Sequence, residues 1–144
     1  MSELVQATVN GLDRIKTFVG PLREDSLRRV LDNGWTVAAT LAHLAFWDRW
    51  VEARWSHFLR TGAFHDLPDD ITDLVNEAAK PEWHAVPPPE TVRLCLDAAA
   101  SVTRTIQRLS SGHILAAVET GRLALVDRTM HWYPHVDEIS SASG

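Results

Sequence analysis

The sequence predicts an all-α fold, built as a bundle of four long helices. Apolar residues recur at helical spacing in four long segments, and no segment shows sustained alternation of apolar and polar residues, as a half-exposed strand would. The length of 144 residues fits a single domain that covers residues 1–144. A core of this size folds without disulfides or a structural metal, so a metal bound here is not needed for folding.

The first long helix is expected over residues 3–19. Ser2 is a suitable N-cap, because its hydroxyl can accept a hydrogen bond from a free N–H of the first turn. Gly20 and Pro21 end the helical pattern. A short helical piece is expected within residues 24–31.

The second helix is expected over residues 36–60, with Thr36 as its N-cap and Gly62 just beyond its end. No glycine or proline interrupts residues 37–60. One stripe along this helix is apolar except for Asp48, and it contains Val37, Leu41, Leu44, Ala45, Asp48, Val51, Trp55 and Phe58. A second stripe beside it carries His43, Trp47, Trp50 and Arg54.

Residues 62–90 are rich in proline and are expected to be irregular, apart from a short helix over 69–79. The third long helix is expected over 89–109. One or two helical turns follow within 113–120, and the last helix is expected over 123–140.

Composition and charge exclude several classes of function. The formal net charge is −5, and no run of basic residues is longer than Arg28-Arg29, which argues against binding to nucleic acid or to an anionic membrane surface. The longest charge-free apolar stretch, residues 34–47, is too short to span a membrane. We see no secretory signal and expect a soluble cytoplasmic protein.

Arginine outnumbers lysine twelve to two, which suggests a GC-rich bacterial genome. The single cysteine, Cys95, is expected to be a small buried hydrophobic residue.

Three histidines stand out as candidate metal ligands. His131 and His135 are four residues apart, so on a helix both imidazoles can reach one ion. Two surface or capping histidines would give the same spacing. His43 interrupts an apolar stretch, where an imidazole needs a hydrogen-bond partner or a metal. The remaining histidines lie in polar or loop contexts and are expected to face solvent: His57, His65, His84 and His113.

Two segments resemble the DinB/YfiT-like family. Residues 34–37 (Gly-Trp-Thr-Val), followed by 41–45 (Leu-Ala-His-Leu-Ala), are similar to the start of that family's second helix. Residues 127–139, which contain the HxxxH pair, are similar to its last helix. The two segments occur in the family's order, and the similarity spans nearly the whole chain.

The resemblance implies a four-helix bundle with up-down-down-up connectivity. It implies a divalent metal, Zn or Ni, held by one histidine of the second helix and two of the last helix. By position these are His43, His131 and His135, whose ring nitrogens we expect to converge between the two helices. Known reactions in the family include thiol-dependent transfer and isomerisation with a low-molecular-weight thiol.

Pro134 departs from this pattern, because it lies between the two histidines of the HxxxH pair. Proline lacks a backbone N–H and its ring crowds the carbonyl of Met130. If the helix begins near Asp127 or Thr129, the consequence is a kink. If it begins at Pro134 instead, His131 lies in a loop. We favour the kinked helix, because Tyr133 would be a poor N-cap.

Other residues have two interpretations each. Trp47, Trp50 and Tyr133 either wall a pocket above the metal or pack in the core and in a dimer interface. Asp127 either orients the imidazole of His131 or caps the helix. Asp48 is expected to form a structural ion pair, either with a neighbour of Arg49 or with an arginine of another helix.

The leading functional hypothesis is a metal-dependent enzyme, a thiol-dependent S-transferase or hydrolase that acts on a small molecule. Three neutral imidazoles leave a coordination position open, as catalytic zinc sites do. The thiol cofactor would be one such as mycothiol. The second hypothesis is a metal-free DinB-like binding or stress-associated protein without catalysis, and the third is a homodimeric interaction module. The pattern assigns no catalytic residue other than the proposed ligands.

Overall fold

The computed structural model describes residues 2–142, and within them the chain forms seven α-helices, one 3-10 helix and no strand. The all-α prediction is therefore confirmed. In chain order the elements are α1 (Glu3–Val19), α2 (Glu24–Leu27), α3 (Val37–Thr61), α4 (Asp69–Ala85), α5 (Pro88–Gln107), α6 (Ser111–Glu119), η1 (Leu123–Leu125) and α7 (Thr129–Ala142).

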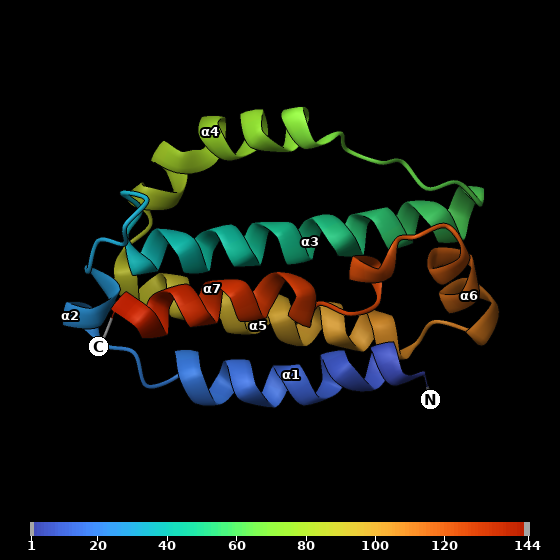
Figure 1. Cartoon of the computed structure of the whole chain (residues 1–144), viewed down its shortest axis with the longest axis horizontal. Helices are drawn as coiled ribbons and strands as arrows, with labels where there is room; N and C mark the ends of the chain where they lie inside the picture. The colour runs from blue at the N-terminus through green and yellow to red at the C-terminus, as the bar shows by residue number, and fades with distance from the viewer. Residues whose placement is uncertain (1, 143–144) are drawn as a thin grey trace.

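Four long helices lie side by side in the body of the molecule (Figure 1). Helix α5 contacts both α1 and α3, and α7 contacts the same two helices. Helices α1 and α7 run in one direction and α3 and α5 in the other, while α4 runs along the outer side of α3 (Figure 1). This arrangement places the first half of α3 against α7, which carries the HxxxH pair.

The main core is apolar and lies between these four helices. Trp55 and Trp132 are its largest fully buried side chains, and the indole N–H of Trp55 donates to the backbone carbonyl of Leu125 at 2.8 Å. Burying two tryptophans that satisfy their N–H groups stabilises the packing of α3 against the segment that leads into α7.

The first two long helices begin and end as the sequence predicts. The hydroxyl of Ser2 accepts from the N–H of Leu4 at 3.1 Å, and that of Thr36 accepts from the N–H of Ala39 at 3.0 Å. Gly62 ends α3 with a φ of 74°, a left-handed conformation that glycine adopts at little cost.

Helix α4 is longer than expected, because it continues past Pro81 to Ala85. Its last part is held by a second, smaller hydrophobic cluster, in which Trp83 packs against Ala39 and Ala42 of α3. Burial of this tryptophan keeps the chain helical beyond the proline, which the local sequence disfavours.

The last helix begins at Thr129, six residues later than the expected start at 123. Residues 123–125 form a 3-10 turn instead, and a contact with α1 fixes the segment that follows. The hydroxyl of Thr8 donates to the carbonyl of Val126 at 2.6 Å and accepts from the N–H of Arg128 at 3.0 Å. These two bonds use backbone groups that a longer helix would need for itself.

No helix within residues 2–142 is both long enough and apolar enough to cross a membrane. This agrees with the expectation drawn from the apolar stretch at residues 34–47.

Candidate metal centre

A cavity of about 640 Å³ opens between α3, the first half of α4 with the loop before it, and α7 with the segment that leads into it. All three candidate histidines line it. Its other lining residues come from the same elements and are Trp47, Trp50, Val51, Arg54, Leu67, Asp69, Thr72, Asn76, Ala124, Leu125 and Arg128.

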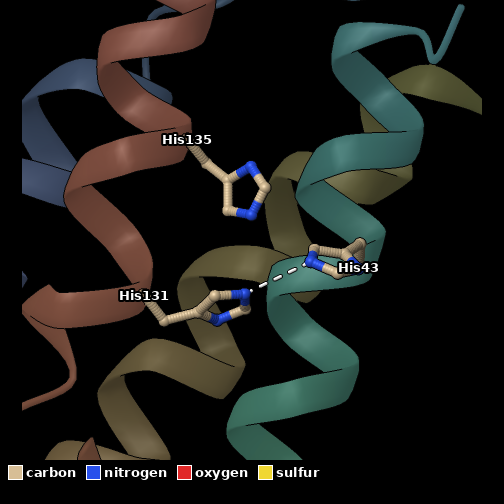
Figure 2. Close-up of side chains that lie close together, drawn as sticks. All are labelled: His43, His131 and His135. Atoms are coloured by element: carbon tan, nitrogen blue, oxygen red, sulfur yellow. Dashed lines mark hydrogen bonds between the residues drawn. The ribbon is translucent and has the colours of Figure 1, made fainter. Parts of the chain in front are cut away.

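The three histidines converge on the wall of this cavity. His43 projects from α3, and His131 and His135 project from α7 toward it (Figure 2). One ring nitrogen of each lies within 4.8 Å of the other two, a separation that suits three ligands of one metal ion. Nε2 of His43 and Nε2 of His131 are 3.2 Å apart.

Pro134 does not separate the two histidines of α7. The helix runs without a break from Thr129 to Ala142, so His131 lies in its first turn and not in a loop. Pro134 itself is exposed. The two imidazoles therefore share one face of the helix, as the four-residue spacing predicts.

Asp127 caps α7, in agreement with one of its two interpretations. Its carboxylate accepts from the backbone N–H of Thr129 at 3.0 Å and from the hydroxyl of the same residue at 2.5 Å. The side chain that contacts the His131 ring is that of Arg128.

Burial keeps the three imidazoles neutral. It lowers the pKa of His43 from 6.5 to about 4, and the nearby charge of His135 acts in the same direction, while the Asn76 side chain acts against both. Burial also places the pKa of His131 well below its ordinary value, helped by the charge of Arg128. The pKa of His135 is lowered by burial, although the carboxylate of Glu138 opposes the shift. Neutral imidazole is the form that binds metals.

The second ring nitrogen of each histidine has a different environment. Nδ1 of His135 lies 3.9 Å from Oε1 of Glu138, which is too far for a hydrogen bond, and both atoms are buried without a hydrogen-bond partner among the described residues. Nδ1 of His43 is buried and has no hydrogen-bond partner among the described residues. Nδ1 of His131 lies 3.3 Å from Nη2 of Arg128, and because arginine only donates, this nitrogen accepts.

Arg128 is held in place by a buried ion pair with Asp48. Nε of Arg128 donates to Asp48 Oδ1 at 2.9 Å, and the side chains are only 5% and 1% exposed. The indole N–H of Trp132 also donates to the Asp48 carboxylate, and Nη1 of Arg128 donates to the carbonyl of Ala124. The expected ion pair between Asp48 and an arginine of another part of the chain is therefore present.

The donor set fits a divalent ion in two respects and requires one change. Three neutral imidazoles converge, and the carboxylate of Glu138 lies 3.9 Å from His135, close to where metal-bound histidines usually have a hydrogen-bond acceptor. The hydrogen bond from Arg128 to Nδ1 places the proton of neutral His131 on Nε2, the nitrogen that faces His43. Coordination through that Nε2 requires the proton to leave and Arg128 to give up this hydrogen bond.

The aromatic residues divide between the cavity and the core. Trp47 and Trp50 line the cavity, and the indole N–H of Trp47 donates to Asn76 of α4 at 2.8 Å. Tyr133 does not line it. Its ring instead packs under the guanidinium of Arg14 of α1, whose carbon lies 4.2 Å from the ring centre.

Sequence reasoning missed three polar residues around the histidines: Asn76, Arg128 and Glu138. Only Glu138 carried a local signal, because it follows His135 by three residues and so lies on the same helix face. Asn76 and Arg128 reach the site through the packing of α4 and α7 against α3, which no spacing within one helix reveals.

The remaining histidines and the cysteine are not part of this cluster. His65 and His84 are exposed as expected, whereas His57 and His113 are half-buried. Cys95 is buried, and burial raises the pKa of its thiol to about 12, so it behaves as a small hydrophobic residue.

Comparison with curated proteins and with solved structures gave no match. A family profile did match residues 10–135, the greater part of the chain, which include all three histidines. Its description is "Mycothiol maleylpyruvate isomerase N-terminal domain". This family is part of the DinB/YfiT-like superfamily, so the match supports the resemblance at the level of the superfamily. The chain belongs to the mycothiol maleylpyruvate isomerase N-terminal domain family, within the DinB/YfiT-like superfamily.

Proposed function

We propose that this protein is a metal-dependent enzyme that uses a low-molecular-weight thiol to transform a small molecule. The observation that carries the proposal is the set of three neutral imidazole nitrogens within 4.8 Å of one another on the wall of a cavity of about 640 Å³. The family is named for an isomerase that carries mycothiol in its name, which supports a thiol as the cofactor. The reaction class we favour is S-transfer, with hydrolysis as the variant in which water replaces the thiol.

In this proposal His43, His131 and His135 hold a divalent ion, Zn or Ni. When bound, the ion supplies Lewis acidity that lowers the pKa of a coordinated thiol or water. Glu138, whose Oε1 lies 3.9 Å from Nδ1 of His135, would accept the Nδ1 proton after a small movement of its side chain and would then hold the ring with its other nitrogen toward the cluster. Trp47 forms the cavity wall next to His43 and is fixed through its bond to Asn76. It shields the reacting atoms from water on that side.

The architecture in this proposal is one domain over residues 1–144, a four-helix bundle with up-down-down-up connectivity. The directions of α1, α3, α5 and α7 in Figure 1 support that connectivity. The bundle supplies the rigid frame on which two helices present the three histidines.

A second candidate is a metal-free binding protein that keeps the fold. One observation favours it. Arg128 donates to Nδ1 of His131, so the proton of that ring is on Nε2, from which it can be donated to Nε2 of His43. This hydrogen bond between the two rings needs no metal.

Metal content distinguishes the two candidates. We expect purified protein incubated with Zn or Ni and then desalted to retain about one ion per chain by elemental analysis. A His131→Ala variant should lose most of it, and a His84→Ala variant, which removes an exposed histidine, should retain it. The loaded protein should then accelerate thiol addition to an electrophilic small molecule. Wild-type protein that stays metal-free at neutral pH would reject the enzyme and favour the binding protein.

A further inference from the structure

The cavity continues well beyond the histidines along the second stripe of α3. This stripe runs from His43 through Trp47 and Trp50 to Arg54, and all four side chains line the cavity. Arg54 follows His43 by eleven residues, which corresponds to about 16 Å along the helix at ~1.5 Å per residue. The cavity is therefore elongated, with imidazoles at one end, indole rings between and a guanidinium at the other end.

Arg54 has donor capacity that the protein leaves unused. Its side chain is only 16% exposed, and its Nη2 donates to Asp66 Oδ1 at 2.7 Å. Its Nε is buried and has no hydrogen-bond partner within residues 2–142. An unsatisfied buried N–H is costly. Because this atom is itself buried, a ligand acceptor would reach it after a small rotation of the guanidinium toward the cavity, and relief of the unsatisfied donor would favour that rotation.

The charge around Arg54 is not balanced by its partner. Asp66 is shared with Arg122, which donates to both of its oxygens, at 2.9 and 2.6 Å. One carboxylate is thus paired with two guanidinium groups, so the three groups together carry one net positive charge. Asp69 also lines the cavity, but it is exposed and lies in solvent.

We propose that Arg54 binds a carboxylate at the end of an elongated ligand whose middle contacts Trp47 and Trp50 and whose other end reaches the histidines. An arginine forms short, charge-assisted hydrogen bonds to a carboxylate, and these are stronger than bonds to a neutral acceptor. The indole rings suit an apolar or aromatic spacer. That the histidine end is the reacting end rests on the proposed function, whereas the carboxylate site at Arg54 does not.

The test uses metal-free protein, so that its result does not depend on the metal site. The probes are 4-phenylbutyrate and its uncharged amide, 4-phenylbutyramide, at about 0.1 M salt. Binding is followed through the indole N–H signals of Trp47 and Trp50 in two-dimensional NMR. We expect wild-type protein to bind the carboxylate about tenfold more tightly than the amide, and Arg54→Leu to reduce this ratio to about one while leaving amide binding unchanged.

Two further variants keep the test decisive. Arg60→Leu removes an exposed arginine of the same helix outside the cavity, and it should keep the tenfold ratio. Arg54→Lys keeps the charge and the fold but moves the donor, so its ratio should lie below that of wild type. The proposal is overturned if wild-type protein shows no preference for the carboxylate, or if both Arg54 variants keep the wild-type ratio. A protein that can be loaded with metal but shows no preference for the carboxylate would overturn this inference alone. A protein that shows the preference but cannot be loaded with metal would overturn only the proposed enzyme.

Discussion

Nη2 of Arg128 lies 3.3 Å from Nδ1 of His131, so a cation donates to the ring nitrogen that faces away from His43. A neutral imidazole carries one proton, and arginine cannot accept it. The proton of His131 therefore sits on Nε2, 3.2 Å from Nε2 of His43. Arg128 therefore sets the tautomer of a candidate ligand, through a hydrogen bond that the spacing of residues within one helix does not predict.

We expect metal-free protein at neutral pH to hold His131 as the neutral Nε2–H tautomer. The physical reason is that Nδ1 is engaged as an acceptor by Arg128. Long-range ¹H–¹⁵N correlation spectra of the histidine rings report which nitrogen carries the proton. His65→Gln removes an exposed ring that lies outside the cluster and so simplifies the spectra. A His131 ring that carries its proton on Nδ1 would show that Arg128 does not set the tautomer.

The buried ion pair between Arg128 and Asp48 should stabilise the fold. Arg128→Gln leaves the Asp48 carboxylate buried without a counter-ion, which typically costs ~3–5 kcal/mol. The double variant Asp48→Asn/Arg128→Gln removes both charges and keeps an acceptor for Trp132, so it should recover most of that loss. Urea unfolding of wild type and the two variants measures these free energies. Equal stability of the single and double variants would contradict a strong coupling between the two residues.

The same double variant should bind metal more tightly than wild type. A glutamine amide oxygen at position 128 can accept the Nδ1 proton that His131 must carry when Nε2 is a ligand. Changes in such supporting groups typically alter metal affinity by ~10–100-fold, and we expect a gain of about tenfold. Competition with a chromophoric chelator for Zn gives the affinity, and His84→Ala serves as the control. Unchanged or weaker affinity would show that Arg128 does not oppose coordination.

The sequence predicted the long helices well where local signals mark their ends. Ser2 and Gly20 bound α1 at the expected residues, and Thr36 begins α3. The prediction of helix ends failed where contacts between residues far apart in the sequence determine where a helix ends or begins. Pro81 does not end α4, because Trp83 is buried against α3, and Thr8 of α1 takes the backbone groups that would let the last helix start earlier.

The candidate site was predicted in part for the same reason. His131 and His135 follow from one helical spacing, and His43 stands out as a polar residue in an apolar stretch. Arg54 was placed on the right helix face, but its unused donor depends on how Asp66 is shared. Such relations require side-chain positions from separate elements, which periodicity does not contain.

Helices α1 and α7 lie close together at Gly11, and we expect that the missing side chain of this glycine allows that close contact. A Cβ at Gly11 would lie 2.4 Å from Cγ2 of Thr129 and 3.3 Å from the hydroxyl of Tyr133. Gly11→Ala should therefore destabilise by about 1–3 kcal/mol, despite the better helix propensity of alanine. Thermal unfolding measures the effect.

Two variants separate this contact from a general effect of alanine. Thr129→Ser removes the methyl group that the new Cβ would meet, so it should restore much of the loss when combined with Gly11→Ala. Gly112→Ala introduces a Cβ whose nearest neighbour is 3.8 Å away, and it should be neutral or stabilising. Equal losses for Gly11→Ala and Gly112→Ala would rule out a contact between α1 and α7 as the cause.

The metal-free protein should lose stability as the pH falls through the range in which free imidazole protonates. Burial lowers the pKa of His43 from 6.5 to about 4, so between these values the unfolded chain binds a proton that the folded chain does not. Stability is therefore full above about pH 6.5 and declines as the pH falls toward 4, by about 3 kcal/mol for this residue alone. The pKa values of His131 and His135 are also lowered by burial and act in the same direction.

Urea unfolding from pH 7.5 to 4.5, in chelator-treated samples, follows the decline in stability. Replacing His43 with Gln should flatten this dependence. A wild-type protein whose stability stays constant across this range would contradict neutral burial of the three rings.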